Sequence, residues 1–317
     1  MQCWKSCTWP GISCLMKQER CKKYGGLVLL KGNNIFESKL YALKIAKLNN
    51  LILINGYDHP HILAGQGTVG LEILEQVPDV DAIIVPVGGG GLLAGICVAV
   101  KSIRPEVIII GVESNRCPGF HEAMLAGQPV YTENRLSSAD GLAVSVVGVN
   151  SFETAHKLVD KVITIDETYI YRAVVRLLEL EKSVVECSGA TSLSAIMANM
   201  LPELVGKKVV CLLTGGNIDI PTLNRVIDKG LALEGRLCRF TVVLTDQPGS
   251  IAELSLILKE NGVKTIYCIK DISYDRIWSI SSILQVQVKC ICEIRNFSHG
   301  IDLEHTLKAK YKDIIWG

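Results

Sequence analysis

Hydrophobic positions along the chain alternate between short runs typical of strands and longer stretches with helical spacing. Apolar runs rich in β-branched residues predict strands at 27–30, 51–54, 82–87, 107–112, 161–165 and 208–213. Helical spacing predicts helices at 36–48, 92–102, 169–180 and 190–200, and Thr68 is a candidate N-cap for another. Strands that alternate with helices in this way favour an α/β fold with a parallel sheet and helices on both faces.

The strand predicted at 27–30 has no earlier strand in the sequence with which to pair. Residues 1–22 contain four cysteines and two tryptophans but show no clean periodicity. We therefore expect this first β-α-β unit to form a small, exposed sheet from which a preceding part is missing.

The stretch Asp81 to Val100 is the most informative segment of the sequence. A buried strand is followed by four consecutive glycines, Gly88 to Gly91, which open a helix. Glycines allow backbone N–H groups to approach a ligand, and the start of a helix carries partial positive charge. The pattern therefore predicts an anion site, most simply for a phosphate group.

Other interpretations of this stretch are weaker or remain open. Ala82 to Val100 carries no charge and is long enough to cross a membrane, but Pro86 and the glycines would leave backbone groups unsatisfied in lipid. A Walker A loop is excluded because no Lys-Ser/Thr pair follows. A Rossmann dinucleotide site is the runner-up, since Gly89, Gly91 and Ala94 fit its glycine pattern and Glu113 ends the next strand. A tightly packed turn without a ligand is the plain alternative.

Composition narrows the class of partner. The 317 residues are 49% hydrophobic and 21% charged, with a net charge of +1, which is globular and points to neither nucleic acid nor an anionic membrane surface. Twelve cysteines occur without a C-x-x-C pair, and the first 15 residues lack the apolar core of a secretion signal. We expect reduced thiols, a cytoplasmic protein and a small-molecule ligand.

Further candidate residues follow other predicted elements. Thr214, with Gly215 and Gly216, ends a strand where parallel sheets place ligands, although an ordinary turn is equally consistent. Asp140 lies in a polar loop, and Glu186 precedes a helix of small residues that permits close approach to another segment. His59 and His61 flank a proline, and a metal role for them is disfavoured because no third ligand is nearby.

The sequence changes character past Gly230. From Arg239 it predicts strand, turn, helix, two strands and a closing helix from Asp302 to Tyr311, a β-α-β-β-α module. Cys290 and Cys292 alternate along one strand, and packing is a better explanation for them than metal ligation.

Four motifs in order, PVGGGGLLAG, SSADGLAV, ECSGATSL and LLTGGN, together with YDHPHILAGQGTVGLEI, give the chain a family resemblance. From about Cys21 to Asn217 it resembles the threonine dehydratase and serine racemase family of fold-type II (tryptophan synthase β-like) enzymes, which depend on pyridoxal 5′-phosphate (PLP). The tail resembles an ACT-type regulatory domain, with Asp246, Pro248, Gly249 and Leu254 matching its signature and Ile251 in place of leucine. The expected division is 1–58, a remnant of the small domain; 59–235, the large PLP-binding domain; and 236–317, the ACT-like domain.

The resemblance implies roles for particular residues. The cofactor phosphate would be held by Gly88, Gly89, Gly90, Gly91 and the N–H of Leu92. Thr214 would face the pyridine nitrogen, where many relatives have serine, and a hydroxyl there suits β-elimination because it does not force the nitrogen to stay protonated. Glu186 would lie near the ring and Asp140 at the border of the pocket. Each also has an ordinary structural explanation: Glu186 as an acidic residue at the start of a helix and Asp140 as an acidic residue in a turn.

Two departures from the family limit what the resemblance implies. Some relatives bind a divalent cation through an acid matching Glu113 and a second acid six residues later, but position 119 is glycine, so we expect no metal. The Schiff-base lysine of the family stands in a Ser-Phe-Lys-type motif, and no lysine here has that context. Because that lysine is also the base for the Cα proton, we expect no catalytic lysine in this chain, and little activity from it alone.

The expected function is therefore that of an L-threonine or L-serine ammonia-lyase, giving a 2-oxo acid and ammonia from a PLP-dependent β-elimination. Two alternatives remain open. One is a non-catalytic regulatory or decoy subunit that binds a free amino acid through the ACT-like domain and pairs with a full-length relative. The other is an NAD(P)-binding Rossmann oxidoreductase. ACT modules commonly pair through their sheets, so a homo-oligomer is expected as well.

Overall fold

A computed structural model describes residues 6–9, 15–33, 35–263, 269–275, 282 and 284–317. The chain forms two compact units, Met1–Leu223 and Asn224–Gly317. No helix in the described part of the chain is long and apolar enough to cross a membrane.

A four-stranded parallel sheet forms the centre of the first unit. Its strands are β3 (Ala82–Pro86), β4 (Ile108–Ser114), β5 (Lys161–Ile165) and β6 (Val209–Cys211), in the order β5-β4-β3-β6. Every residue of β3 is buried, which explains its continuous apolar run. The parallel arrangement predicted from the sequence is confirmed.

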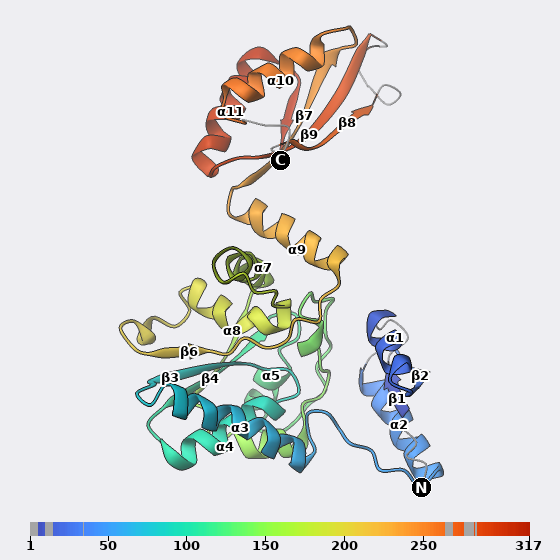
Figure 1. Cartoon of the computed structure of the whole chain (residues 1–317), viewed down its shortest axis with the longest axis vertical. Helices are drawn as coiled ribbons and strands as arrows, with labels where there is room; N and C mark the ends of the chain where they lie inside the picture. Colours follow the sequence, from blue (N-terminus) through green and yellow to red (C-terminus); the bar gives the residue numbers. More distant parts are fainter. Residues whose placement is uncertain (1–5, 10–14, 34, 264–268, 276–281, 283) are drawn as a thin grey trace. The chain divides into compact units, whose positions relative to one another are not determined.

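Helices cover both faces of this sheet (Figure 1). They are α3 (Pro60–Gln76), α4 (Gly91–Ile103), α5 (Gly119–Ala126), α6 (Val149–Ala155), α7 (Glu167–Arg176) and α8 (Cys187–Met197). Short helical turns occupy Asp140–Leu142, Leu177–Glu181 and Pro202–Leu204. Helices α3 and α4 pack closely with β3 around Ile83, Leu93 and Ile96, which are fully buried.

The N-terminal segment differs from the sequence-based expectation in two places. It contains β1 (Ser6–Trp9), α1 (Leu15–Lys23), β2 (Leu27–Leu30) and α2 (Ile35–Leu48). The strand at 27–30 does have an earlier partner, because β1 pairs with it in parallel, Ser6 opposite Leu27. Residues 51–54 form no strand, so that prediction was wrong.

The start of α3 also differs from the prediction. His59 is the N-cap, its Nδ1 accepting a hydrogen bond from the N–H of His61 at 3.3 Å, and Pro60 occupies the first helical position. Thr68 lies inside the helix, where its hydroxyl donates to the carbonyl of Gly65 at 2.8 Å. The helix begins eight residues before the predicted cap because proline and histidine supply the start signals.

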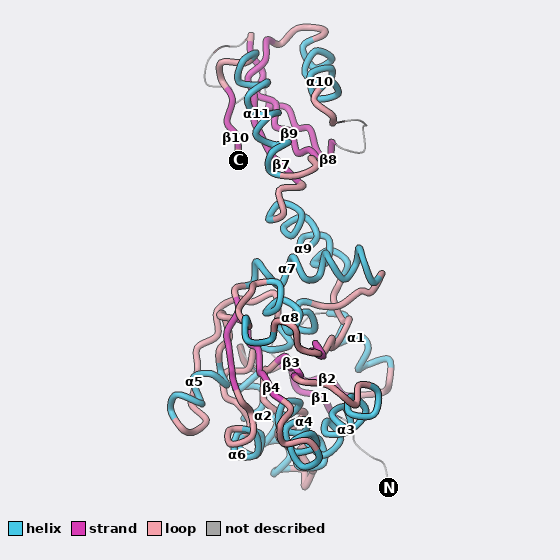
Figure 2. The backbone as a smooth tube through the Cα atoms, turned by 90° about the vertical axis from the view of Figure 1, so that its left-hand side faces the viewer, coloured by secondary structure: helices cyan, strands magenta, loops and turns pink. Residues whose placement is uncertain are grey.

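Helix α9 (Ile220–Leu233), which was not predicted, spans the division between the two units. From β7 (Leu237–Thr245) onward the second unit has the predicted order of elements with one strand added at its end: α10 (Ser250–Glu260), β8 (Ile269–Asp275), β9 (Gln285–Glu293), α11 (Phe297–Lys310) and β10 (Ile314–Trp316). The antiparallel sheet has the order β10-β7-β9-β8, and α10 and α11 pack against one of its faces (Figure 2). Cys290 and Cys292 are fully buried in this core, as packing residues.

Candidate functional site

The glycine loop connects β3 to α4 and presents backbone N–H groups. Gly90 is the N-cap of α4 and has a φ of 91°, a conformation that favours glycine. Among the described residues, no carbonyl or side chain accepts a hydrogen bond from the N–H of Gly88, Gly89 or Gly90. Gly91 and Leu92 are the first two residues of α4, whose N–H groups have no partner within the helix. The loop therefore places N–H groups without a described partner at the positive end of a helix.

Neighbouring segments pack tightly against this loop. A Cβ at Gly89 would lie 2.3 Å from the Tyr57 ring, one at Gly91 would lie 2.4 Å from the Tyr57 carbonyl oxygen, and one at Gly90 would lie 2.9 Å from Phe120. The carbonyl of Gly89 also accepts from the N–H of Gly148 at 3.0 Å. Close packing alone thus requires glycine at these positions, and the N–H groups are held in place by it.

Thr214 follows β6 and lies at the same edge of the sheet as the glycine loop. Strands β3 and β6 are parallel neighbours, with Ile84 opposite Cys211, and the N–H of Leu212 donates to the carbonyl of Ile84 at 3.0 Å. Gly88 and Thr214 follow these two strands by two and three residues. Since neighbouring strands lie about 4.8 Å apart, both segments are within the span of one small molecule.

Close contacts connect these two segments through the loop at 140–142 and the start of α8. A Cβ at Gly88 would lie 2.9 Å from Leu142 Cα, and the N–H of Gly141 donates to Ser188 Oγ at 3.0 Å. The Glu186 carboxylate lies against Gly215, where a Cβ would be 2.3 Å from its Oε1. The predicted residues from the glycine loop to Glu186 are therefore gathered at one edge of the sheet.

The small residues of α8 allow it to approach the end of β6. A Cβ at Gly189 would lie 1.5 Å from the carbonyl oxygen of Thr214, and the N–H of Glu186 donates to the carbonyl of Gly215 at 3.2 Å. The close approach predicted for this helix is to the backbone of Thr214. Asp140 is exposed and begins the short turn Asp140–Leu142, whose carboxyl end contacts Gly88.

Glu113 lies at the end of β4 and is fully buried. Its two carboxylate oxygens accept from the N–H groups of Phe120 at 2.7 Å and His121 at 2.8 Å, at the start of α5. Burial raises the pKa of Glu113 to about 8, although the two N–H donors act to lower it. A buried carboxyl group that caps a helix is not available to a ribose hydroxyl, which removes the main support for the Rossmann alternative.

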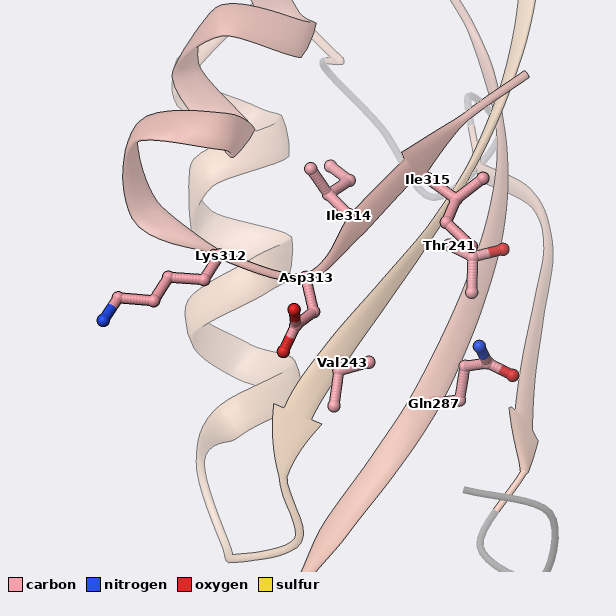
Figure 3. Close-up of a pocket in the computed structure, with 7 residues that line it drawn as sticks. All are labelled: Thr241, Val243, Gln287, Lys312, Asp313, Ile314 and Ile315. Atoms are coloured by element: carbon pink, nitrogen blue, oxygen red, sulfur yellow. The ribbon is translucent and has the colours of Figure 1, made fainter. Parts of the chain in front are cut away.

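No group of three metal-ligating side chains occurs among the described residues. The rings of His59 and His61 lie 5.2 Å apart, and His59 serves as the helix cap. A separate hollow lies on the second unit's sheet, on the face opposite its helices (Figure 3). Its lining comprises Thr241, Val243, Gln287, Lys312, Asp313, Ile314 and Ile315.

The site fits the phosphate of PLP. Gly89 and Gly90 are buried, and buried N–H groups without a partner are costly. An anion that accepts from them would satisfy those donors and interact favourably with the start of α4. Thr214 and Glu186 lie at the same edge of the sheet.

Several residues of the site were not predicted from the sequence. Tyr57 packs against the glycine loop, and although it begins the motif YDHPHILAGQGTVGLEI, the sequence does not show what its ring contacts. Ser188 lies two residues after Glu186 in the motif ECSGATSL, so the sequence did contain a signal for its hydroxyl. Glu167 follows a strand and is the first residue of a helix, where acidic residues are common, so the sequence does not single it out.

Comparison with known proteins shows the family to which the chain belongs. Residues 7–215 match the family described as pyridoxal-phosphate dependent enzyme. The L-threonine ammonia-lyase of Geobacter sulfurreducens is 38% identical over 278 residues, which cover 88% of this chain and 68% of that protein. The L-threonine ammonia-lyase of Thermotoga maritima is 34% identical over 301 residues, 95% of this chain and 74% of that protein.

A solved structure, the processed form of threonine deaminase isoform 2 from Solanum lycopersicum, aligns with a TM-score of 0.66 and 30% identity over 72% of this chain and 66% of that chain. The chain thus spans about two thirds to three quarters of the length of these relatives. With the glycine loop, the parallel sheet and these matches together, the chain belongs to the pyridoxal-phosphate dependent enzyme family and has its fold-type II core.

Proposed function

We propose that this chain binds PLP at the carboxyl edge of its parallel sheet and contributes to the β-elimination of L-threonine or L-serine. One observation carries the proposal. The N–H groups of Gly88, Gly89 and Gly90 have no partner among the described residues, and the glycine loop and Thr214 follow neighbouring parallel strands. The two relatives described above as L-threonine ammonia-lyases support the choice of reaction.

The chemistry that PLP supplies when bound is an electron sink for negative charge developing at the Cα atom of an amino acid. The glycine loop would hold the phosphate and so fix the position of the ring. Thr214 would offer a neutral hydroxyl to the ring nitrogen, which weakens the sink relative to a carboxylate partner and favours elimination over transamination. Glu186, held between Gly141 and Gly215, would lie beside the ring.

The base for the Cα proton is not among these residues. The family lysine belongs to a Ser-Phe-Lys-type motif that this sequence does not contain. We therefore propose that the chain alone binds PLP but releases little 2-oxo acid from threonine or serine. Reduction with borohydride followed by peptide mapping would reveal any lysine that bonds to PLP, and a mapped lysine would contradict this part of the proposal.

The proposal is tested by titrating the purified chain with PLP and with pyridoxal, which lacks the phosphate. We expect PLP to bind at least tenfold more tightly. Replacing Thr214 with valine should weaken PLP binding by about 2- to 10-fold, the value of one net hydrogen bond. Thr306→Val, in the second unit, is the matched control and should have no effect. Equal affinities for PLP and pyridoxal would overturn the assignment.

We also propose that the second unit is an ACT-like module that binds a free amino acid and joins subunits into an oligomer. The order of elements supports this, as does Gly249, which caps α10 with a φ of 99° after Asp246 and Pro248. The cytoplasm is the proposed location, since the described cysteines are free thiols. Light scattering of the purified chain distinguishes an oligomer from a monomer.

A further inference from the structure

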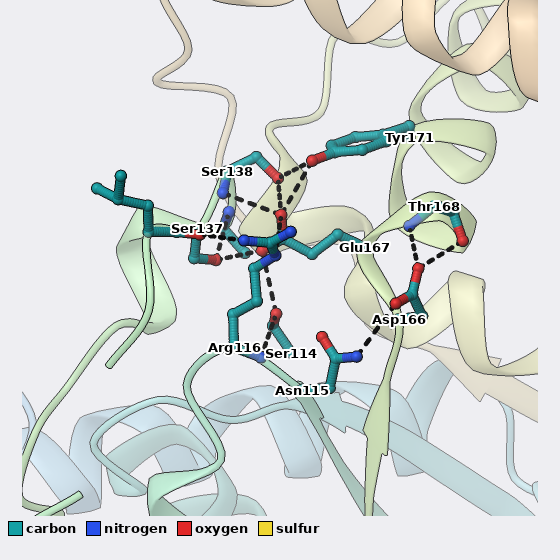
Figure 4. A network of polar contacts seen from close by, with 11 residues as sticks. Ser114, Asn115, Arg116, Ser137, Ser138, Asp166, Glu167, Thr168 and Tyr171 are labelled. Carbon is teal, nitrogen blue, oxygen red and sulfur yellow. Dashed lines mark hydrogen bonds and ion pairs between the residues drawn. The ribbon is translucent and has the colours of Figure 1, made fainter. Parts of the chain in front are cut away.

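Glu167 is a buried carboxylate that the proposed chemistry does not use. It is the first residue of α7, and its side chain is 5% exposed. Its Oε2 accepts from Ser138 Oγ at 2.9 Å and from Tyr171 OH at 2.9 Å, while its Oε1 accepts from Ser114 Oγ at 3.1 Å and from Ser137 Oγ. Figure 4 shows these groups converging on one carboxylate from three segments of the chain.

The carboxylate of Glu167 is held in its charged form. Burial acts to raise its pKa, but the hydrogen bonds from Ser137, Ser138 and Tyr171 outweigh burial, and the pKa lies below its usual range. Arg116 adds an ion pair at 3.5 Å. Hydrogen bonds to a charged acceptor are about twice as strong as neutral ones, so this is a strong anchor.

The anchored segment is the beginning of the loop that borders the site. Ser137 and Ser138 both donate to Glu167, and the N–H of Ser138 also donates to it at 3.3 Å. Arg116 holds the preceding residue, because its Nη1 donates to the carbonyl of Leu136 at 3.0 Å. The far end of the loop is fixed by two contacts. The N–H of Gly141 donates a hydrogen bond to Ser188 Oγ, and Leu142 packs against Gly88.

We propose that Glu167 is a positioning residue that fixes the loop 137–142 against the glycine loop and thereby prepares the PLP site. The identity of the ligand, PLP, rests on the proposed function. The contacts that hold Ser137 and Ser138 on Glu167 do not involve PLP. Loss of the charge should release Ser137 and Ser138 first and then loosen the contact of Leu142 with Gly88.

The test compares Glu167→Gln, which keeps the shape and removes the charge, with Glu203→Gln, an exposed residue paired with Lys161. Hydrogen exchange is measured for the amides of 138–144 in the absence of PLP, and the dissociation constant for PLP is measured separately. We expect at least tenfold faster exchange in this loop and at least fivefold weaker PLP binding for Glu167→Gln. No change is expected for Glu203→Gln.

Two further variants distinguish positioning from general stability. Tyr171→Phe removes one hydroxyl donor and should give the same changes in smaller degree, and it decides the question if Glu167→Gln fails to fold. Glu167→Asp keeps the charge and should restore much of the loop's protection. Exchange that is unchanged at 138–144, or faster throughout the unit to the same extent, would overturn the inference. Failure of the unsubstituted chain to bind PLP would instead overturn the proposed function, while the exchange result would still decide the role of Glu167.

Discussion

Glu113 and Glu167 are both buried acids near the ends of neighbouring strands, yet their pKa values shift in opposite directions. Burial dominates at Glu113, whose oxygens receive two backbone N–H groups. At Glu167 burial is outweighed by three hydroxyl groups and a backbone N–H, with Arg116 beside them. The charge of each carboxyl group therefore depends on the balance between its burial and the number and kind of its hydrogen-bond donors, both of which depend on tertiary contacts.

The raised pKa of Glu113 makes stability depend on pH. Between about pH 5 and pH 8 the folded state keeps a proton that the unfolded state releases, so the free energy of unfolding falls as pH rises. One such group changes the free energy of unfolding by at most about 1.4 kcal/mol per pH unit. The Glu113→Gln variant has no ionisable proton at this position, so its stability relative to the unsubstituted chain should improve as pH increases. Denaturant unfolding at several pH values measures this.

The control for Glu113→Gln is Glu75→Gln, on an exposed position of α3. Its stability difference from the unsubstituted chain should stay constant with pH. A difference for Glu113→Gln that is constant, or that grows less favourable toward pH 8, would show that burial does not hold the proton on Glu113.

At the scale of elements, the crossing of α3 and α4 depends on a glycine that the sequence pattern does not distinguish from others. Gly95 lies where a Cβ would be 2.4 Å from the carbonyl oxygen of Leu63 and 2.6 Å from the N–H nitrogen of Gly67. Gly65, also inside a helix, has open space around it. The sequence predicted α4 and the part of α3 after Thr68, but not the first turns of α3, which contain Leu63 and Gly65. Which residues of the two helices face each other depends on how the helices are packed.

These two glycines give a matched pair of substitutions. Helix propensity alone predicts that either change to alanine stabilises by about 1 kcal/mol. We expect this gain for Gly65→Ala, but a loss of about 1 to 3 kcal/mol for Gly95→Ala, because the two helices must move apart. Thermal or denaturant unfolding measures both, and stabilisation by Gly95→Ala would show that α3 and α4 do not cross as closely as described.

Sequence patterns were most successful for elements whose signals are local. The strand, glycine loop and helix from 82 to 103 were predicted because the apolar run and the glycines are contiguous. The strand wrongly predicted at 51–54 shows the limit, since a short apolar run does not reveal whether a partner strand exists. The pairing of β1 with β2 and the packing of Tyr57 over the glycine loop were missed for the same reason.

At the scale of the whole molecule, the chain combines a parallel α/β unit with a smaller antiparallel unit that has its own core. The order of motifs predicted the first unit, and the pattern of strands and helices from Arg239 predicted the second. The compact units divide between Leu223 and Asn224, within α9, whereas the sequence placed a boundary after residue 235. A continuous helix gives no local signal of such a division, so the three-part division remains a prediction.

The most direct measurement is a crystal structure of the chain soaked with PLP. We predict that the phosphate lies within about 3 Å of the backbone nitrogens of Gly88, Gly89 and Gly90, with the pyridine nitrogen facing Thr214. Density for PLP at another place, with these N–H groups bound only to water or protein, would contradict the account.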